Sequence, residues 1–210
     1  MELTSIKKTK KGRYALFIEG EFAFSVSAEQ LFSENIRAGN EYGAAELSAM
    51  LDASQELFAK EYAMKLLSAR RYTKARLLEK LCPLVKEDAA RRAAGRLEEL
   101  GLLDDEDYAE KLASDCYRLR NYGKARVIQA LVQKGIDRES ARKTAENLEP
   151  DAFAAIYGLL ERKYGSALLE AESKAEFFKA RSRVSGALSR LGYGFDDIKK
   201  ALDEYVRENA

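Results

Sequence analysis

The residues with the clearest chemical use are arginines and lysines that gather in three segments of the chain. Guanidinium and ammonium groups hold phosphates and carboxylates, so such segments could bind a polyanion. In residues 65–80, Glu79 is the only acid beside Arg70, Arg71, Lys74 and Arg76. Residues 116–136 and 177–195 contain no acid. Their cations are Arg118, Arg120, Lys124, Arg126 and Lys134 in the second segment, and Lys179, Arg181, Arg183 and Arg190 in the third.

A single charge run is more often a solvated helix face than a binding site, and that interpretation stays open. The same polarity at three equivalent places gives the binding interpretation about equal weight. Stacked units would align the segments into a basic stripe that suits an extended polyanion or an acidic protein groove. Tyr72 and Tyr122 precede two of the segments' helices. Tyr122 joins the candidate binding residues because a tyrosine could stack on bases, although bracing a helix junction is the favoured role.

The composition argues against catalysis. Histidine is absent, which removes the common general base, the usual zinc ligand and every nucleophile pairing that needs an imidazole. Gly123 lacks the earlier glycine of a phosphate-binding loop, and Cys82 and Cys116 fit no metal-ligand spacing. The acids of residues 104–107 could suggest a metal site, but they suit a helix start, where free amides and the helix dipole favour carboxylates. We expect a non-enzymatic binding protein without cofactor or metal.

The total charge is close to zero, because 36 basic side chains are balanced by 35 acidic ones. A uniformly basic nucleic-acid binder is thereby excluded, whereas a locally basic one is not. No stretch approaches the roughly 18 apolar residues of a membrane span, and no apolar run follows the first lysines as in a signal peptide. The sequence predicts a cytoplasmic protein with reduced cysteines and no membrane contact.

Residues 1–54 form an N-terminal extension whose pattern differs from the rest. Two runs rich in aromatic and β-branched residues, 13–18 and 22–26, flank a short glycine turn and predict a β-hairpin. Ser27 is placed to cap a short helix that ends near Phe32, and a second short helix is expected over residues 44–51. Since an isolated hairpin is marginal in water, the extension should pack on the helices that follow.

From residue 55 onward the apolar spacing is helical, and the pattern occurs three times. Arg76, Arg126 and Arg183 each open a middle helix, and a leucine follows five residues after each arginine. The expected units are residues 55–103, 104–149 and 150–210, with a spacing near 50 residues. We predict a mainly α protein in which three tandem three-helix, helix-turn-helix-like repeats pack end to end into an elongated body.

The second unit resembles the central motif of the RecX family. The resemblance is carried by residues 101–109 (GLLDDEDYA), 122–131 (YGKARVIQAL) and 133–136 (QKGI). Residues 63–71 resemble the opening helix of that family, residues 191–198 its closing segment, and the N-terminal hairpin the extension of some members. Two departures are visible: residues 82–84 replace the usual lysine-glycine ending of the first unit, and the first helix of the third unit is divergent.

The resemblance implies a regulator of the RecA recombinase, with roles in DNA repair, recombination and the SOS response. Members bind the filament of RecA on single-stranded DNA along its groove and restrain filament growth, ATP hydrolysis, strand exchange and repressor cleavage. Some members also bind DNA directly. We expect a monomer that binds the filament through the basic stripe.

Two other functions stay open. A helix-turn-helix transcriptional regulator would bind duplex DNA sequence-selectively, usually as a dimer, but no dimer seam is visible in the sequence. A plain helical scaffold for an unrelated protein is the third interpretation.

Overall fold

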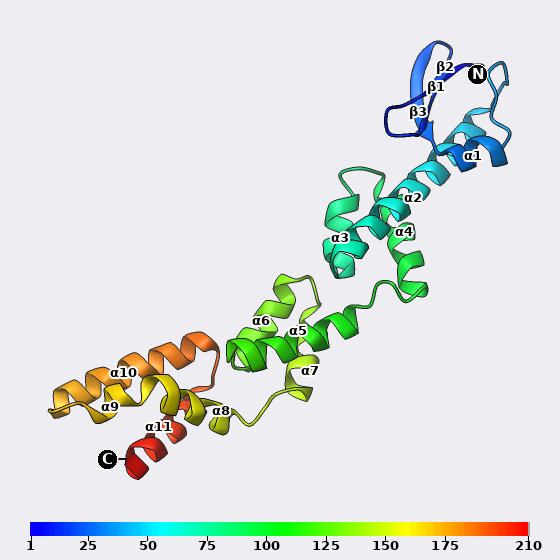
Figure 1. Ribbon diagram of the computed structural model, residues 1–210. Coiled ribbons are helices and arrows are strands. Elements are labelled where there is room, and N and C mark those ends of the chain that lie inside the picture. Colours follow the sequence, from blue (N-terminus) through cyan, green and yellow to red (C-terminus); the bar gives the residue numbers. More distant parts are fainter. Residues whose placement is uncertain (210) are drawn as a thin grey trace. The chain divides into compact units, whose positions relative to one another are not determined.

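The computed structural model describes residues 1–209, and these residues are mainly helical with one small sheet near the N-terminus (Figure 1). Contacts divide the chain into two compact units, Met1–Asp104 and a second that begins at Asp105. The first contains the sheet and the first predicted repeat, and the second contains the other two repeats. The predicted fold class, mainly α with an N-terminal β extension, is confirmed.

The sheet has three antiparallel strands in the order β1 (Leu3–Lys8), β2 (Tyr14–Ile18) and β3 (Glu21–Val26). Strands β2 and β3 are the predicted hairpin. Strand β1 was missed by the sequence analysis because its lysines and hydroxyl residues lack the aromatic signal of the other two strands. It forms because Leu3 and Ile6 join the apolar side of the sheet, where Leu16 is only 1% exposed.

Helix α1 (Ala28–Ser33) begins as predicted, with the Ser27 hydroxyl accepting a hydrogen bond from the Gln30 amide at 3.0 Å. The predicted short helix over residues 44–51 is wrong, because α2 runs without interruption over Ala44–Ala69. The polar Ser54 interrupts the apolar spacing, yet it is buried and its hydroxyl donates to the Ser25 carbonyl of β3 at 2.6 Å. This hydrogen bond to the sheet satisfies the buried Ser54 hydroxyl, so the helix continues through a polar residue.

Helix α2 therefore belongs to two hydrophobic clusters (Figure 1). Its first half packs on the sheet through Met50, and its second half packs on α3 (Lys74–Leu81) and α4 (Glu87–Glu99) through Ala59 and Ala63. The expected boundary at residue 54 falls inside this helix. The division of residues 1–54 from the first repeat remains a prediction, as do the boundaries between the repeats.

The second repeat consists of α5 (Asp105–Arg120), α6 (Lys124–Gln133) and α7 (Arg138–Asn147). The acids of residues 105–107 lie in the first turn of α5, as the helix-start interpretation expects. Core residues of the first two repeats correspond at a constant spacing of 50 positions, and all are 0–2% exposed. The pairs are Ala59 with Ala109, Ala63 with Ala113, Leu77 with Val127, and Leu81 with Leu131.

The third repeat begins differently. Its first helix is α-helical only in α8 (Ala152–Leu159). It continues as the π-helical turn η1 (Leu160–Tyr164) and is followed by the short α9 (Ser166–Leu169). Gly165 follows η1 and lies against the phenol of Tyr205, where a Cβ atom would collide with the ring. Helices α10 (Lys174–Leu191) and α11 (Phe195–Asn209) complete the repeat and enclose Val184, Leu188 and Ile198.

The number of rapidly reacting thiols should distinguish the folded from the unfolded chain. Cys82 is exposed, whereas Cys116 is 0% exposed and burial raises the pKa of its thiol. Since the thiolate is the reacting species, we expect one rapid reaction per chain with a disulfide reagent at pH 8, and two in denaturant. The Cys82→Ser variant should show no rapid reaction. Two rapid thiols in the native protein would contradict the packing of α5.

Candidate functional site

The first basic segment surrounds the start of α3. The Arg70 guanidinium lies 4.6 Å from the centre of the Tyr72 ring, and Thr73 caps α3 by accepting from the Arg76 amide at 3.2 Å. Lys74 pairs with Glu98 at 2.6 Å and Arg76 with Glu79 at 2.7 Å, both on exposed surfaces. Exposed ion pairs contribute about 0–1 kcal/mol to stability and are screened by salt, so these cations can still exchange partners. Arg71 is exposed beside Arg70.

The second segment surrounds the start of α6 and is more ordered. The Tyr122 ring lies between two guanidinium groups, 4.8 Å from that of Arg126 and 5.9 Å from that of Arg120. Hydrogen bonding to Arg126 is the main cause that lowers the pKa of the Tyr122 hydroxyl, and Arg120 lowers it further. Lys124 pairs with Glu149 at 2.9 Å, which raises the pKa of the ammonium group.

Tyr72 and Tyr122 both pack partly against the cores of their own repeats. This position is the one expected for a residue that braces a helix junction. One guanidinium group lies over the Tyr72 ring, and two lie over the Tyr122 ring. The tyrosines thus hold exposed arginines near the starts of α3 and α6 through cation–π contacts.

The remaining cations of the second segment lie at other helix ends. Arg118 is exposed in the last turn of α5, where a cation suits the negative end of the helix dipole. Lys134 is the C-cap of α6, ten residues from Lys124 and therefore roughly 15 Å along the helix axis. Lys134 thus lies apart from the cations at the start of α6.

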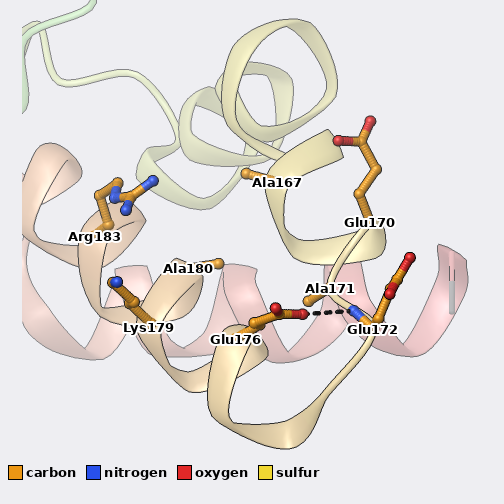
Figure 2. A pocket seen from close by; sticks show the side chains of 8 residues that line it. All are labelled: Ala167, Glu170, Ala171, Glu172, Glu176, Lys179, Ala180 and Arg183. Carbon is orange, nitrogen blue, oxygen red and sulfur yellow. Dashed lines mark hydrogen bonds between the residues drawn. The ribbon is translucent and has the colours of Figure 1, made fainter.

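In the folded protein, acids from other elements lie near the cations of the third segment. Arg181 pairs with Asp203 of α11 at 2.6 Å. Lys179 and Arg183 line a surface concavity of the third repeat, and Figure 2 shows them at one end of it with Glu170 and Glu172 at the other. Glu176 lies between them and accepts from the Glu172 amide at 3.1 Å. Residues 177–195 contain no acid, but neighbouring elements place carboxylates beside them.

Arg190 is the member of the third segment that reaches the second. Its carbonyl accepts a hydrogen bond from Arg126 at 3.0 Å, at the point where the start of α6 meets the end of α10. Arg120, Tyr122 and Arg126 therefore form one group with the backbone of Arg190, which we call the junction cluster. The other cations of the third segment lie nearer the start of α10, at Lys179, Arg181 and Arg183. The first segment belongs to the other compact unit.

The backbone at this junction leaves no room for side chains. The Gly123 amide donates to the Leu191 carbonyl at 2.8 Å, and the Ala125 amide donates to the Gly192 carbonyl at 3.3 Å. A Cβ atom on Gly123 would lie 2.5 Å from the Gly192 carbonyl carbon, and one on Gly192 would lie 2.5 Å from the Arg126 nitrogen. Free amides at the start of α6 thus meet free carbonyls at the end of α10. We call this contact the glycine junction.

The sequence analysis missed the glycine junction. Gly192 ends α10 with a φ of +95°, the left-handed conformation that glycine commonly adopts after a helix. Gly123 was noted only for lacking a phosphate loop. The one available signal was the difference between Thr73 and Gly123 at equivalent positions. Thr73 caps its helix with its own hydroxyl, whereas Gly123 leaves space for a backbone that comes from 69 residues away.

Two further properties concern all described residues. Within residues 1–209, no group of three or more histidine, cysteine, aspartate and glutamate side chains could hold a metal ion. Over the same range, every helix is too short or too polar to cross a membrane.

Two sequence-family models match the chain. Residues 104–144 match the second three-helix domain of RecX, and residues 1–42 match the N-terminal domain of regulatory protein RecX. The chain is 27% identical over 207 residues to a protein of Clostridioides difficile (strain 630) named regulatory protein RecX, covering 97% of this chain and 95% of that protein. A regulatory protein RecX of Clostridium botulinum (strain Eklund 17B / Type B) is 25% identical over 202 residues, covering 96% and 93%.

Solved structures share the fold. A crystal structure titled regulatory protein RecX has a TM-score of 0.68 at 21% identity and covers 96% of this chain and 98% of that chain. The structure of RecX from Lactobacillus salivarius has a TM-score of 0.64 at 21% identity, with 73% and 97% covered. The first structure therefore shares the fold over nearly the whole chain, and the second shares it over 73% of the chain.

Alanine at either glycine of the junction should destabilise the second unit. For Gly123→Ala and Gly192→Ala we expect a loss of about 1–3 kcal/mol in the free energy of unfolding, because the methyl group would overlap backbone atoms. Urea unfolding followed by circular dichroism measures this. Gly95→Ala is the matched control: Gly95 is inside α4 with open space around its Cβ position, so alanine should stabilise the helix by up to about 1 kcal/mol. Equal stability of all three variants would contradict the junction.

Proposed function

The chain belongs to the RecX family, and we propose that it is a non-enzymatic inhibitor of the RecA recombinase that binds the filament of RecA on single-stranded DNA. Its relatives are named as regulatory proteins, and likeness over nearly the whole of both chains supports a regulatory role here. In the proposal the protein binds in the filament groove as a cytoplasmic monomer. It would limit filament growth, ATP hydrolysis, strand exchange and repressor cleavage.

The observation that carries the proposal is the placement of cations at helix starts. Lys74 and Arg76 occupy the first turn of α3, and Lys124 and Arg126 that of α6, with no acid in either turn. The positive end of a helix dipole disfavours cations by roughly 0.3–1 kcal/mol each. Helix α5, by contrast, starts with three acids. Ion pairs with Glu98, Glu79 and Glu149 offset part of this cost, and a negatively charged partner would offset it further.

The junction cluster supplies the geometry for such a partner. Tyr122 and the backbone of Arg190 hold the Arg126 guanidinium in place, and Arg120 lies on the same ring. Held arginines lose less side-chain entropy when they bind phosphate or carboxylate. The partner surface can be DNA phosphates or acidic side chains of the filament, since both accept from guanidinium groups.

The helix-turn-helix alternative is less well supported. A recognition helix reads base edges with its N-terminal residues, which must be free to enter the major groove. The N-terminus of α6 is covered by the end of α10. Helix α7 starts with Asp137 as its cap and Glu139 in its first turn, and these carboxylates would repel DNA phosphates.

The direct test is ATP hydrolysis by RecA on single-stranded DNA with increasing amounts of this protein, together with co-sedimentation. We expect hydrolysis to fall at substoichiometric to equimolar protein, and the protein to sediment with the filament. Unchanged hydrolysis at equimolar protein, with no co-sedimentation, would refute the proposal.

Charge reversal in the first turn of α6 should weaken inhibition. We expect Lys124→Glu with Arg126→Glu to raise the inhibitory concentration about tenfold or more at low salt, because two attractive contacts become repulsive. The control is Arg138→Glu with Arg142→Glu, an equal charge change on exposed positions of α7 in the same repeat. Circular dichroism checks that both double variants keep the fold.

Three single reversals extend the test beyond the junction. Arg118→Glu leaves the glycine junction untouched, and Arg76→Glu and Arg183→Glu examine the other two repeats. Full inhibition by the Lys124/Arg126 double variant and by all three single variants would mean that the basic segments are solvated faces only.

A further inference from the structure

The three-stranded sheet has one side packed in the protein core and one side open to solvent. Leu16 and Phe24 are paired across β2 and β3 and are 1% and 8% exposed, so they mark the packed side. Phe17 follows Leu16 and points to the other side, and a register shift between Leu16 and Phe17 places Phe22 opposite Phe17. Phe22 is 60% exposed. Ser5 pairs with Phe17 from β1. The open side therefore carries a row of two aromatic rings across adjacent strands.

The two rings form a surface that a third flat group could extend. Their centroids lie 6.0 Å apart with an angle of 71° between the planes, an edge-to-face contact that leaves much of Phe22 free. The Lys7 ammonium lies 4.8 Å from the centre of the Phe17 ring. An ammonium group beside aromatic faces is the combination by which proteins hold the phosphate and the base of one nucleotide.

The strands leading to these rings are strongly basic. Residues 3–18 contain five cations and no acid. Arg13 is used internally, since it donates to the Ser25 carbonyl at 3.0 Å and to the Ser54 hydroxyl at 2.7 Å. Lys7, Lys8, Lys10 and Lys11 are exposed, and within residues 1–209 none of them forms an ion pair.

The two ends of the sheet carry charges of opposite sign. Glu19 and Glu21 lie at the β2–β3 turn, next to Phe17 and Phe22, whereas Lys10 and Lys11 lie at the β1–β2 turn at the opposite end of the sheet. Phe17 is four positions from Arg13 at that end, which is roughly 13 Å along the strand. A bound strand would have its bases at the rings and its phosphates toward the lysines, away from the two acids.

We infer that the open side of this sheet binds single-stranded nucleic acid, with Phe17 and Phe22 stacking on bases and Lys7, Lys10 and Lys11 holding phosphates. Base pairs in a duplex cannot reach the rings, so the site discriminates against double strands. This site is separate from the basic segments of the helical repeats, and it does not require the proposed inhibition of RecA.

The absence of tryptophan from the chain allows a site-specific test. Phe22→Trp creates a single fluorophore in the proposed site of the full-length protein, and Phe32→Trp is the matched control. Phe32 is 76% exposed on α1 of the same module, near Glu29 and Glu34 instead of lysines. Each variant is titrated at low salt with a 15-nucleotide oligo(dT), with a duplex of equal length and with oligo(U). RecA is absent, so failure here is distinct from failure of the proposed function.

We expect oligo(dT) to quench the Phe22→Trp emission by about half or more, the Phe32→Trp emission to change little, and the duplex to quench neither. The oligo(U) titration shows whether RNA can replace DNA, and quenching by either single strand supports the site. Emission of Phe22→Trp that stays constant while anisotropy shows the oligonucleotide bound would overturn it, as would no binding at all. A blue shift that grows with protein concentration alone would mean that a second copy covers Phe22, and would also overturn it.

The lysines are tested by their effect on salt dependence. Replacing Lys7, Lys10 and Lys11 by glutamine in the Phe22→Trp protein should reduce the slope of log affinity against log salt by about 2, since each phosphate contact on a single strand contributes about 0.7. The control replaces Arg138, Arg142 and Lys143 of α7 by glutamine and should leave the slope of the quenching unchanged. Phe22→Ala should weaken binding about tenfold, as expected for the loss of one stacked base. An unchanged slope in the lysine variant would contradict the phosphate contacts.

Discussion

The second compact unit depends on the contact between the start of α6 and the end of α10. A helix leaves amides unsatisfied at its start and carbonyls unsatisfied at its end, and burying either without a partner costs free energy. Here each end satisfies the other through the Gly123 and Ala125 amides. The contact requires two glycines because backbone atoms lie where side chains would begin. It links two repeats whose cores are separate and small.

The glycine junction also places the charged side chains. Once the end of α10 covers the start of α6, the Arg126 side chain lies between the Tyr122 ring and the Arg190 carbonyl. The same contact prevents α6 from entering a DNA groove by its N-terminus. One backbone contact thus gathers cations on an outer surface and covers the helix end that would otherwise read bases, and this agrees with the proposed function.

Helix α2 has a comparable role in the first unit. Its 26 residues pack on the sheet at one end and form part of the first repeat at the other. Ser54 and Arg13 connect the two parts by hydrogen bonds between α2 and the sheet. A small sheet needs a third strand with a hydrophobic face or a helix to pack on, and here strand β1 and helix α2 provide both. The open side of the sheet is then free for a ligand.

Local signals in the sequence were sufficient for much of the structure. The constant spacing of alanine and leucine residues determined the first two repeat cores, because buried helix faces need apolar side chains at regular intervals. Capping residues such as Ser27, Thr73 and Asp137 determined helix starts, because a side-chain oxygen there accepts a free amide. The hairpin and the basic segments were visible for the same reason: each depends on neighbours in the chain.

Tertiary structure decided everything that depends on residues distant in sequence. The continuity of α2 depends on Ser25, which satisfies Ser54, and the third segment is partly neutralised by Asp203 and the acids near α9. The junction cluster exists because Gly192 meets Gly123 across 69 residues. A glycine's lack of a side chain is visible in the sequence, but the backbone that occupies the space is not. The cations are therefore a property of the sequence, and their grouping into a site is a property of the fold.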